Sequence, residues 1–177
     1  NNERKSYKEN GLMHGNNDFD KKQTYNGGKL ILGKVSANTS VNDFVANINF
    51  GGAVISLLNA KGEIVYGKDA DSKFTDKLNN ASEYAVGTGW KLKVYTTAGD
   101  LIDEISISVL GDLTGDGKVN SADINYLRQV ANNGIESLSA EQRLSSLIVN
   151  KGNLPTITDT QILWEAICGR LDLNEFI

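Results

Sequence analysis

The chain of 177 residues has only one cysteine, one histidine and one proline. A single cysteine, Cys168, excludes an internal disulfide and leaves no second thiol for a zinc site, so we expect a small buried side chain on the last helix. The only histidine, His14, lies in a Gly/Asn-rich stretch, and we expect it to be solvated rather than a metal ligand or general base. One proline excludes a Pro-rich linker, whereas the 18 glycines indicate many turns.

Long hydrophobic runs and positive charge are also scarce. No run of 18 apolar residues is present, so we expect no membrane-spanning helix. The net charge of −4 and the pI near 5.0 argue against binding to nucleic acid or another polyanion. A hydrophobic content of 40% is sufficient for a real core. The chain begins without Met or a signal peptide, and we expect it to be an excised or processed piece of a longer protein.

Catalytic groups are equally hard to find. We find no Ser/His/Asp set, no nucleotide-binding glycine loop and no histidine near the carboxylates. The adjacent acids Asp103 and Glu104 lie on an expected strand and would face opposite sides of it, so they would not share a bond to cleave. The sequence therefore predicts that the chain is not an enzyme.

The most informative motif is the run DLTGDGKVNSAD at residues 112–123. In a calcium loop, oxygen ligands occupy positions 1, 3, 5, 7, 9 and 12, and a glycine at position 6 permits a sharp turn. Gly117 stands at this sixth position. We predict a Ca²⁺ site whose ligands are the side chains of Asp112, Thr114, Asp116, Asn120 and Asp123 and the backbone carbonyl of Lys118.

The flanks of this loop differ from those of a complete EF-hand. Before the loop, apolar residues alternate with polar ones, which predicts a strand rather than an entering helix. After the loop, Ser121 is a plausible helix cap and apolar residues recur at helical spacing. The closing ligand is Asp rather than Glu, one methylene shorter. A loop followed by one helix is half an EF-hand, which weighs against a calmodulin-type sensor.

A weak internal repeat follows the loop. A shift of 36 residues places Asp123 on Asp159 and Asn120 on Thr156, and it superimposes the apolar faces of the two expected helices. A short middle helix is expected between them, from residue 138 to 147. In the second loop, Ile148 and Gly152 replace the carboxylates at positions 1 and 5. We therefore predict one well-formed calcium site and a second, degenerate loop.

The rest of the chain is mostly β-rich. Short strands separated by turns are expected at 29–35, 53–58, 63–66, 90–96 and 101–110, with one helix within 39–48. The predicted fold class is therefore α+β and multi-domain. It comprises a polar arm or linker at 1–28, a small β-sandwich-like module at 29–110, and an all-α unit of paired loop-helix (half EF-hand) segments at 111–177.

Residues 111–123 together with Leu127, and the weaker echo at 149–151 and 156–159, resemble a dockerin, the module that binds cohesins in cellulosome-type assemblies. Residues 29–110 are similar to the X or immunoglobulin-like modules that often precede dockerins, through Val35-Ser36 and residues 87–90. The resemblance implies a bacterial, secreted or cell-surface assembly module of polysaccharide degradation. It also implies calcium-dependent folding and a cohesin domain of a scaffoldin or anchoring protein as partner, with the X module as stabiliser or spacer.

The same resemblance implies where the cohesin would bind. In dockerins the contacts lie near the loop ends and along the helices, and Trp164 could serve either there or in the core. Because the two halves differ chemically, docking in a single orientation is expected. The candidate contacts are Ser121, Ala122, Arg128 and Gln129 in the first unit and Ile157, Thr158, Trp164 and Glu165 in the second.

One alternative function remains open, a carbohydrate-binding module supported by the calcium-binding unit. Trp90, Tyr66, Tyr84 and Tyr95 could form a sugar-stacking surface, although Trp90 also suits the edge of a core. An exposed flat row of these aromatic rings would favour sugar binding. Their burial would favour a spacer.

Overall fold

The computed structural model describes residues 23–26, 29–47, 53–67, 84–148 and 155–177. The predictions for His14, for most of the polar arm and for residues 149–154 of the second loop lie outside these ranges. Within them, no helix combines the length and the apolar character needed to cross a bilayer.

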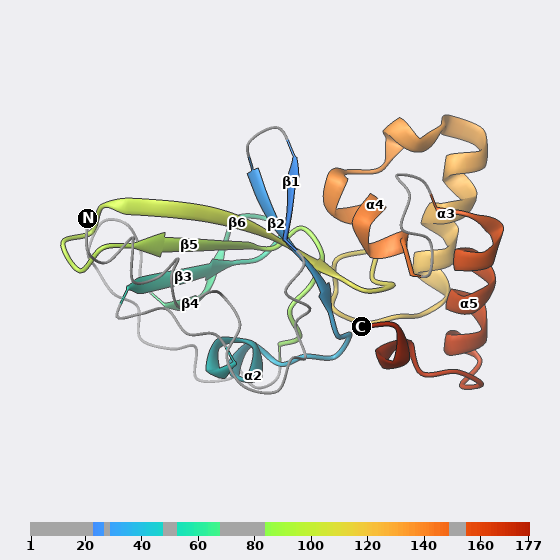
Figure 1. Ribbon diagram of the computed structural model, residues 1–177, viewed down its shortest axis with the longest axis horizontal. Coiled ribbons are helices and arrows are strands. Elements are labelled where there is room, and N and C mark those ends of the chain that lie inside the picture. The colour runs from blue at the N-terminus through green and yellow to red at the C-terminus, as the bar shows by residue number, and fades with distance from the viewer. Residues whose placement is uncertain (1–22, 27–28, 48–52, 68–83, 149–154) are drawn as a thin grey trace.

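A single mixed sheet forms one half of the molecule (Figure 1). Its strand order is β1-β2-β6-β5-β3-β4, and only the β2–β6 pair is parallel. β1 lies within the predicted polar arm, so at least this part of the arm belongs to the sheet. The strands are β1 (Gln23–Asn26), β2 (Lys29–Val35), β3 (Val54–Leu58), β4 (Ile64–Gly67), β5 (Lys91–Tyr95) and β6 (Leu101–Val109).

The period-two pattern of the strands separates an apolar face from a polar one. Leu57, Leu92 and Ile105 are paired across three neighbouring strands, and all three are fully buried. Glu104 lies on the opposite face, where it pairs with Lys91 and Lys93 at 3.2 and 4.0 Å. The register is therefore fixed by the burial of one face.

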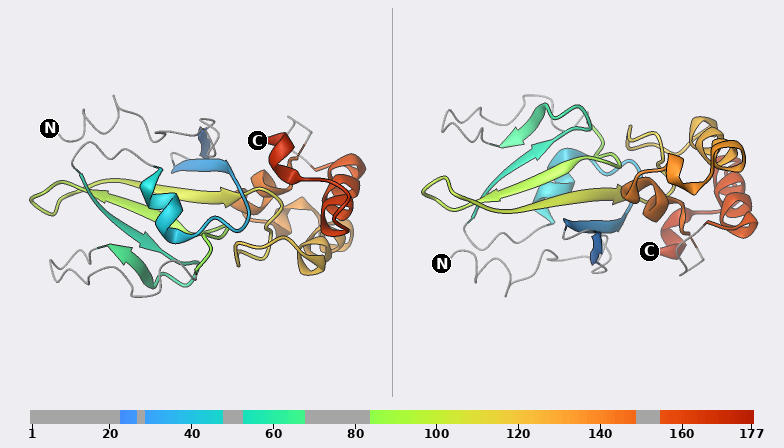
Figure 2. Two further views of the ribbon diagram at one scale, coloured as in Figure 1. Left: turned by 90° about the horizontal axis from the view of Figure 1, so that it is seen from below. Right: turned by 90° about the horizontal axis from the view of Figure 1, so that it is seen from above.

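Helix α2 (Val41–Ala46) covers one face of this sheet, as the two views of Figure 2 show. Ser40 caps the helix by accepting a 3.1 Å hydrogen bond from the Asp43 amide. Val41 and Phe44 are fully buried in the apolar cluster of the sheet. The helix predicted within residues 39–48, with Ser40 as its cap, is confirmed.

The remaining helices gather at one end of the sheet rather than on its face (Figure 1). They enclose a second apolar cluster, which includes the fully buried Leu163. Asn120, not Ser121, is the N-cap of α3, because its side chain accepts a bond from the Ala122 amide at 2.9 Å. The helical elements are α3 (Ser121–Asn133), η1 (Ile135–Ser137), α4 (Ala140–Ser146), α5 (Ile157–Ile167) and η2 (Leu173–Phe176).

The helices are attached to the sheet by hydrogen bonds as well as by packing. α4 packs against β2 and β6. The Ser108 hydroxyl donates to the Glu141 carbonyl at 2.8 Å, and the Gly111 amide donates to the Ser145 carbonyl at 2.8 Å. Ser108 lies in β6 and Gly111 follows two residues after its last residue, so the strand continues directly into the helical part.

The predicted fold class is therefore wrong. The described residues form one α+β domain with a single mixed sheet, not a β-sandwich-like module followed by a separate all-α unit. Alternation along a strand identifies its buried face but not its neighbours. The parallel pairing of β2 with β6, which are separated by about half the chain, could not be derived from local pattern.

Candidate functional site

Asp112, the predicted first ligand, lies fully buried at the junction of β6 and the loop. One carboxylate oxygen accepts a 2.7 Å bond from the Gly115 amide. The other oxygen accepts bonds from the amides of Gly117 at 2.9 Å and Thr88 at 3.0 Å. The carboxylate is thus fixed by three backbone donors, one of which comes from outside the loop.

Asp123, the predicted last ligand, is also fully buried and closes the loop. Its Oδ1 accepts bonds from the amides of Leu113 and Thr114, both at 2.9 Å. Its Oδ2 accepts a 2.8 Å bond from the Asn120 amide, which completes a capping box at the start of α3. One side chain therefore joins the beginning of the loop to the beginning of the helix.

The middle of the loop brings two further predicted ligands to Asp112. The Thr114 hydroxyl lies 3.2 Å from one carboxylate oxygen of Asp112 and 3.2 Å from one of Asp116. Asp116 is exposed and accepts a 2.9 Å bond from the Lys118 amide. Asp112, Thr114 and Asp116 therefore form one group, whereas the Asn120 side chain caps the helix.

The charge of the site favours a divalent cation. Burial raises the pKa of Asp112 above its ordinary value, its three backbone donors lower it, and the nearby charge of Asp123 raises it again. Among the described residues, no Lys or Arg forms an ion pair with Asp112, Asp116 or Asp123. Two buried carboxylates that repel each other without a cationic neighbour are costly unless a cation joins them.

The donor set suits calcium only when all its oxygen types are included. In the described part of the chain, no three His, Cys, Asp or Glu side chains form a group that could by themselves hold a metal ion. The predicted set also includes a hydroxyl, an amide and a backbone carbonyl, which are ligands that Ca²⁺ accepts. These residues fit a calcium ion of the loop-helix type.

Acid should weaken calcium binding at this loop. Ligand carboxylates must be deprotonated to bind a metal. Because the pKa of Asp112 is raised, a proton competes with calcium for this carboxylate at a higher pH than it would for an ordinary aspartate. We expect the apparent calcium affinity to fall as the pH is lowered, beginning above the pH range in which an exposed aspartate titrates. Calorimetric calcium titrations between pH 7 and pH 4 measure this, and a constant affinity over that range would contradict it.

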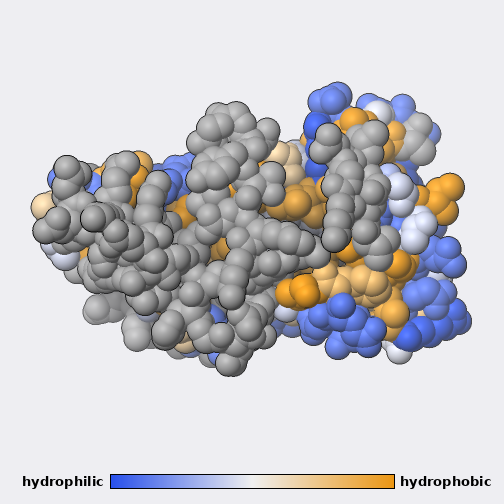
Figure 3. All heavy atoms as spheres, in the orientation of Figure 1, coloured by the Kyte–Doolittle hydropathy of each residue, from blue (hydrophilic) through white to orange (hydrophobic). Residues whose placement is uncertain are grey.

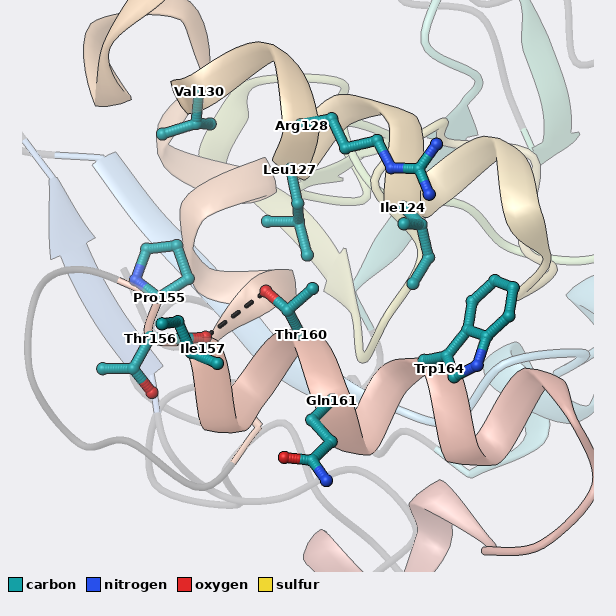
Figure 4. A pocket seen from close by; sticks show the side chains of 10 residues that line it. All are labelled: Ile124, Leu127, Arg128, Val130, Pro155, Thr156, Ile157, Thr160, Gln161 and Trp164. Atoms are coloured by element: carbon teal, nitrogen blue, oxygen red, sulfur yellow. Dashed lines mark hydrogen bonds between the residues drawn. The ribbon is translucent and has the colours of Figure 1, made fainter. Parts of the chain in front are cut away.

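A second feature is an apolar groove between α3 and α5, with a volume of about 670 Å³ (Figure 4). Ile124 and Leu127 project from α3 towards α5, and Trp164 projects from α5 at one end of the groove. Apolar residues also gather over the helical end in the space-filling view (Figure 3). The groove is lined by Ile124, Leu127, Arg128, Val130, Pro155, Thr156, Ile157, Thr160, Gln161 and Trp164.

Three of the eight predicted partner contacts line this groove: Arg128, Ile157 and Trp164. Ser121, Ala122, Gln129 and Thr158 are exposed but do not line it, and Glu165 is half-buried and pairs with Arg170 at 3.2 Å. The sequence did not identify the other seven lining residues. Leu127 and Val130 belong to the apolar residues that recur at helical spacing after the loop. The repeat of that spacing in the second helix is the signal that could have placed them along a shared groove.

The exposure of Trp164 decides between its two possible roles. Its neighbour Leu163 is fully buried, whereas Trp164 is 45% exposed and Ile157 is 87% exposed. Large apolar side chains with exposed fractions this high contribute little to the apolar core formed by the described residues. Trp164 therefore belongs to the surface.

The aromatic residues of the sheet do not form the exposed row that sugar stacking requires. Trp90 and Tyr95 are buried, Tyr66 is half-buried, and Tyr84 is exposed. The Trp90 indole donates a 3.3 Å bond to the Gly115 carbonyl in the loop at 112–123.

Cys168 is exposed at the end of α5, so the prediction of a buried cysteine is wrong.

Comparison of the chain with protein-family models, curated proteins and solved structures gave no match in any of the three searches.

Proposed function

We propose that this chain is a non-catalytic, calcium-dependent docking module of the dockerin type, which binds a cohesin through the groove between α3 and α5. One observation carries the proposal: the loop holds two buried carboxylates, Asp112 and Asp123, without a cationic neighbour among the described residues, and Asp123 anchors the helix that forms one wall of an exposed apolar groove. Helix α3 thus begins at the proposed calcium loop and also lines the proposed docking surface.

Asp112, Thr114, Asp116, Asn120, Asp123 and the carbonyl of Lys118 would hold the calcium ion. When bound, calcium supplies the positive charge that offsets the repulsion between the buried carboxylates. The protein's own contribution is geometric. Asp123 joins Leu113 and Thr114 to the first turn of α3, so an ordered loop sets the position of that helix.

The groove offers a partner both apolar surface and one charge. Trp164 and Ile157 are exposed on α5, and the exposed Arg128 of α3 has no ion pair with any described residue. Tryptophan and arginine are the residues that most often dominate interface energetics. The two helices present different side chains at corresponding positions, so the partner would bind in one orientation.

This function suits a secreted or cell-surface location, because extracellular calcium modules work with weak sites of about 10⁻⁴–10⁻³ M. The sheet then serves as the support on which the loop and helices are built.

Asp159, at the position that repeats Asp123, accepts hydrogen bonds from the amides of Ile148 and Thr156 at 2.9 and 2.8 Å. The second helix start is therefore held by hydrogen bonds of its own.

Chelation is the direct test. We expect a panel of cohesins captured on beads to retain the chain in millimolar calcium and to lose it in excess EGTA, with recovery when calcium is restored. Magnesium in place of calcium serves as control, because it demands a smaller octahedral site and should not restore binding. Retention that is equal with and without calcium would contradict the proposed mechanism.

A further inference from the structure

The calcium loop is not exposed on all sides, because residues 85–90 of the sheet half pack against it. The Thr88 amide donates to the carboxylate of Asp112 at 3.0 Å, and the Trp90 indole donates to the Gly115 carbonyl at 3.3 Å. The Asn38 amide, at the loop before α2, donates to the Gly117 carbonyl at 2.7 Å. Three donors from outside the loop thus reach the carboxylate of Asp112, a predicted ligand, and the carbonyls of Gly115 and Gly117.

The backbones approach each other too closely for side chains. A Cβ on Gly87 would lie 2.0 Å from the Gly115 carbonyl oxygen, and one on Gly115 would lie 2.6 Å from the Thr88 carbonyl oxygen. A Cβ on Gly117 would meet Ala85 and Val86 at 2.6 and 2.7 Å. Because the obstructing atoms are mostly backbone, neither segment can shift without the other.

The same residues are tied firmly to the sheet. Thr88 accepts a 2.9 Å bond from the Val109 amide through its hydroxyl, at the end of β6. The Gly89 amide donates to the Ile107 carbonyl at 2.9 Å, and the Ile107 amide donates to the Trp90 carbonyl at 2.9 Å. Residues 85–90 therefore transmit the position of β6 to the loop through hydrogen bonds on both sides.

We propose that residues 85–90 form an outer layer of the calcium site, in which Thr88 and Trp90 act as positioning residues that couple calcium affinity to the order of the sheet. This inference rests on the calcium site proposed above. It gives the β-rich half a specific role, because that half pre-orients the first calcium ligand instead of serving as a passive spacer. Hydrogen bonds from an outer layer commonly orient metal ligands and tune affinity.

Gly87→Ala tests the coupling. The added methyl would force the Gly115 carbonyl away and displace the loop, so we expect at least a tenfold weaker calcium affinity by calorimetry. Trp90→Phe removes the indole donor together with one ring of a buried side chain, and we expect a several-fold loss. The matched control is Gly99→Ala in the β5–β6 turn: its φ of +96° makes alanine strained, but no atom lies within 4 Å of the added Cβ. It should lose stability and keep its calcium affinity.

A second readout does not depend on these substitutions. In a Trp164→Phe background only Trp90 remains as a tryptophan, so its emission reports on the outer layer. We expect this emission to change on calcium addition, with the same midpoint as the calorimetric titration. An emission that stays constant while calcium binds would overturn the proposal.

The outcomes separate this inference from the proposed function. A wild-type chain that binds no calcium would overturn both. A wild-type chain that binds calcium, with wild-type affinity in both Gly87→Ala and Trp90→Phe, would overturn only the coupling. The same holds if Gly99→Ala loses as much affinity as the two test variants, because general destabilisation would then explain the loss. If Gly87→Ala fails to fold, Trp90→Phe and the emission titration decide.

Discussion

Asp123→Ala should abolish calcium binding at the first loop and lower the free energy of unfolding by on the order of 3 kcal/mol. The carboxylate is fully buried and accepts bonds from the amides of Leu113, Thr114 and Asn120. Alanine would leave these donors without their partner and remove the closing calcium ligand. Calcium calorimetry and urea unfolding, each with and without calcium, measure the two effects.

Asp159→Ala is the control, because Asp159 has the same position in the second loop-helix unit. It is fully buried and accepts bonds from the amides of Ile148 and Thr156. Its loss should destabilise the chain to a similar degree but leave one calcium ion bound. If Asp159→Ala removes calcium binding and Asp123→Ala retains it, the assignment of the first loop as the calcium site is wrong.

Trp164→Ala should weaken cohesin binding by about 30-fold or more, the effect of losing an interface residue worth about 2 kcal/mol. The side chain is 45% exposed at one end of the groove, and among the described residues no hydrogen bond joins it to the loop at 112–123. Calcium affinity should therefore stay unchanged. Surface plasmon resonance with an immobilised cohesin, together with a calcium titration, measures both quantities.

Leu101→Ala provides the comparison for a loss of exposed apolar surface in general. Leu101 is 51% exposed and begins β6, at the end of the sheet far from α3 and α5 (Figure 1). This variant should bind the cohesin as the wild type does. Wild-type binding by Trp164→Ala would remove Trp164 from the docking surface, and an equal loss in both variants would exclude a specific role for the groove.

Local features were predictable because their causes are local. The Ser40 cap and the alternation along β6 depend on interactions within a few residues. The starts of α3 and α5 were found at an offset of 36 residues because each follows the same short local pattern. The position of the α3 cap was missed by one residue. Ser121 and Asn120 are both good caps, and only the capping box with Asp123 selects Asn120.

The sequence by itself determined which residues form the loop and its repeat, since oxygen ligands at fixed spacing and a glycine at the sharp turn are properties of one short segment. Only the tertiary structure decided that the sheet is single and mixed, that α3 and α5 enclose a groove with Trp164 at its surface, and that Thr88 donates to Asp112. These features join residues about 24 to 75 positions apart. Such pairings depend on which apolar faces and backbone donors meet, and local periodicity does not encode that choice.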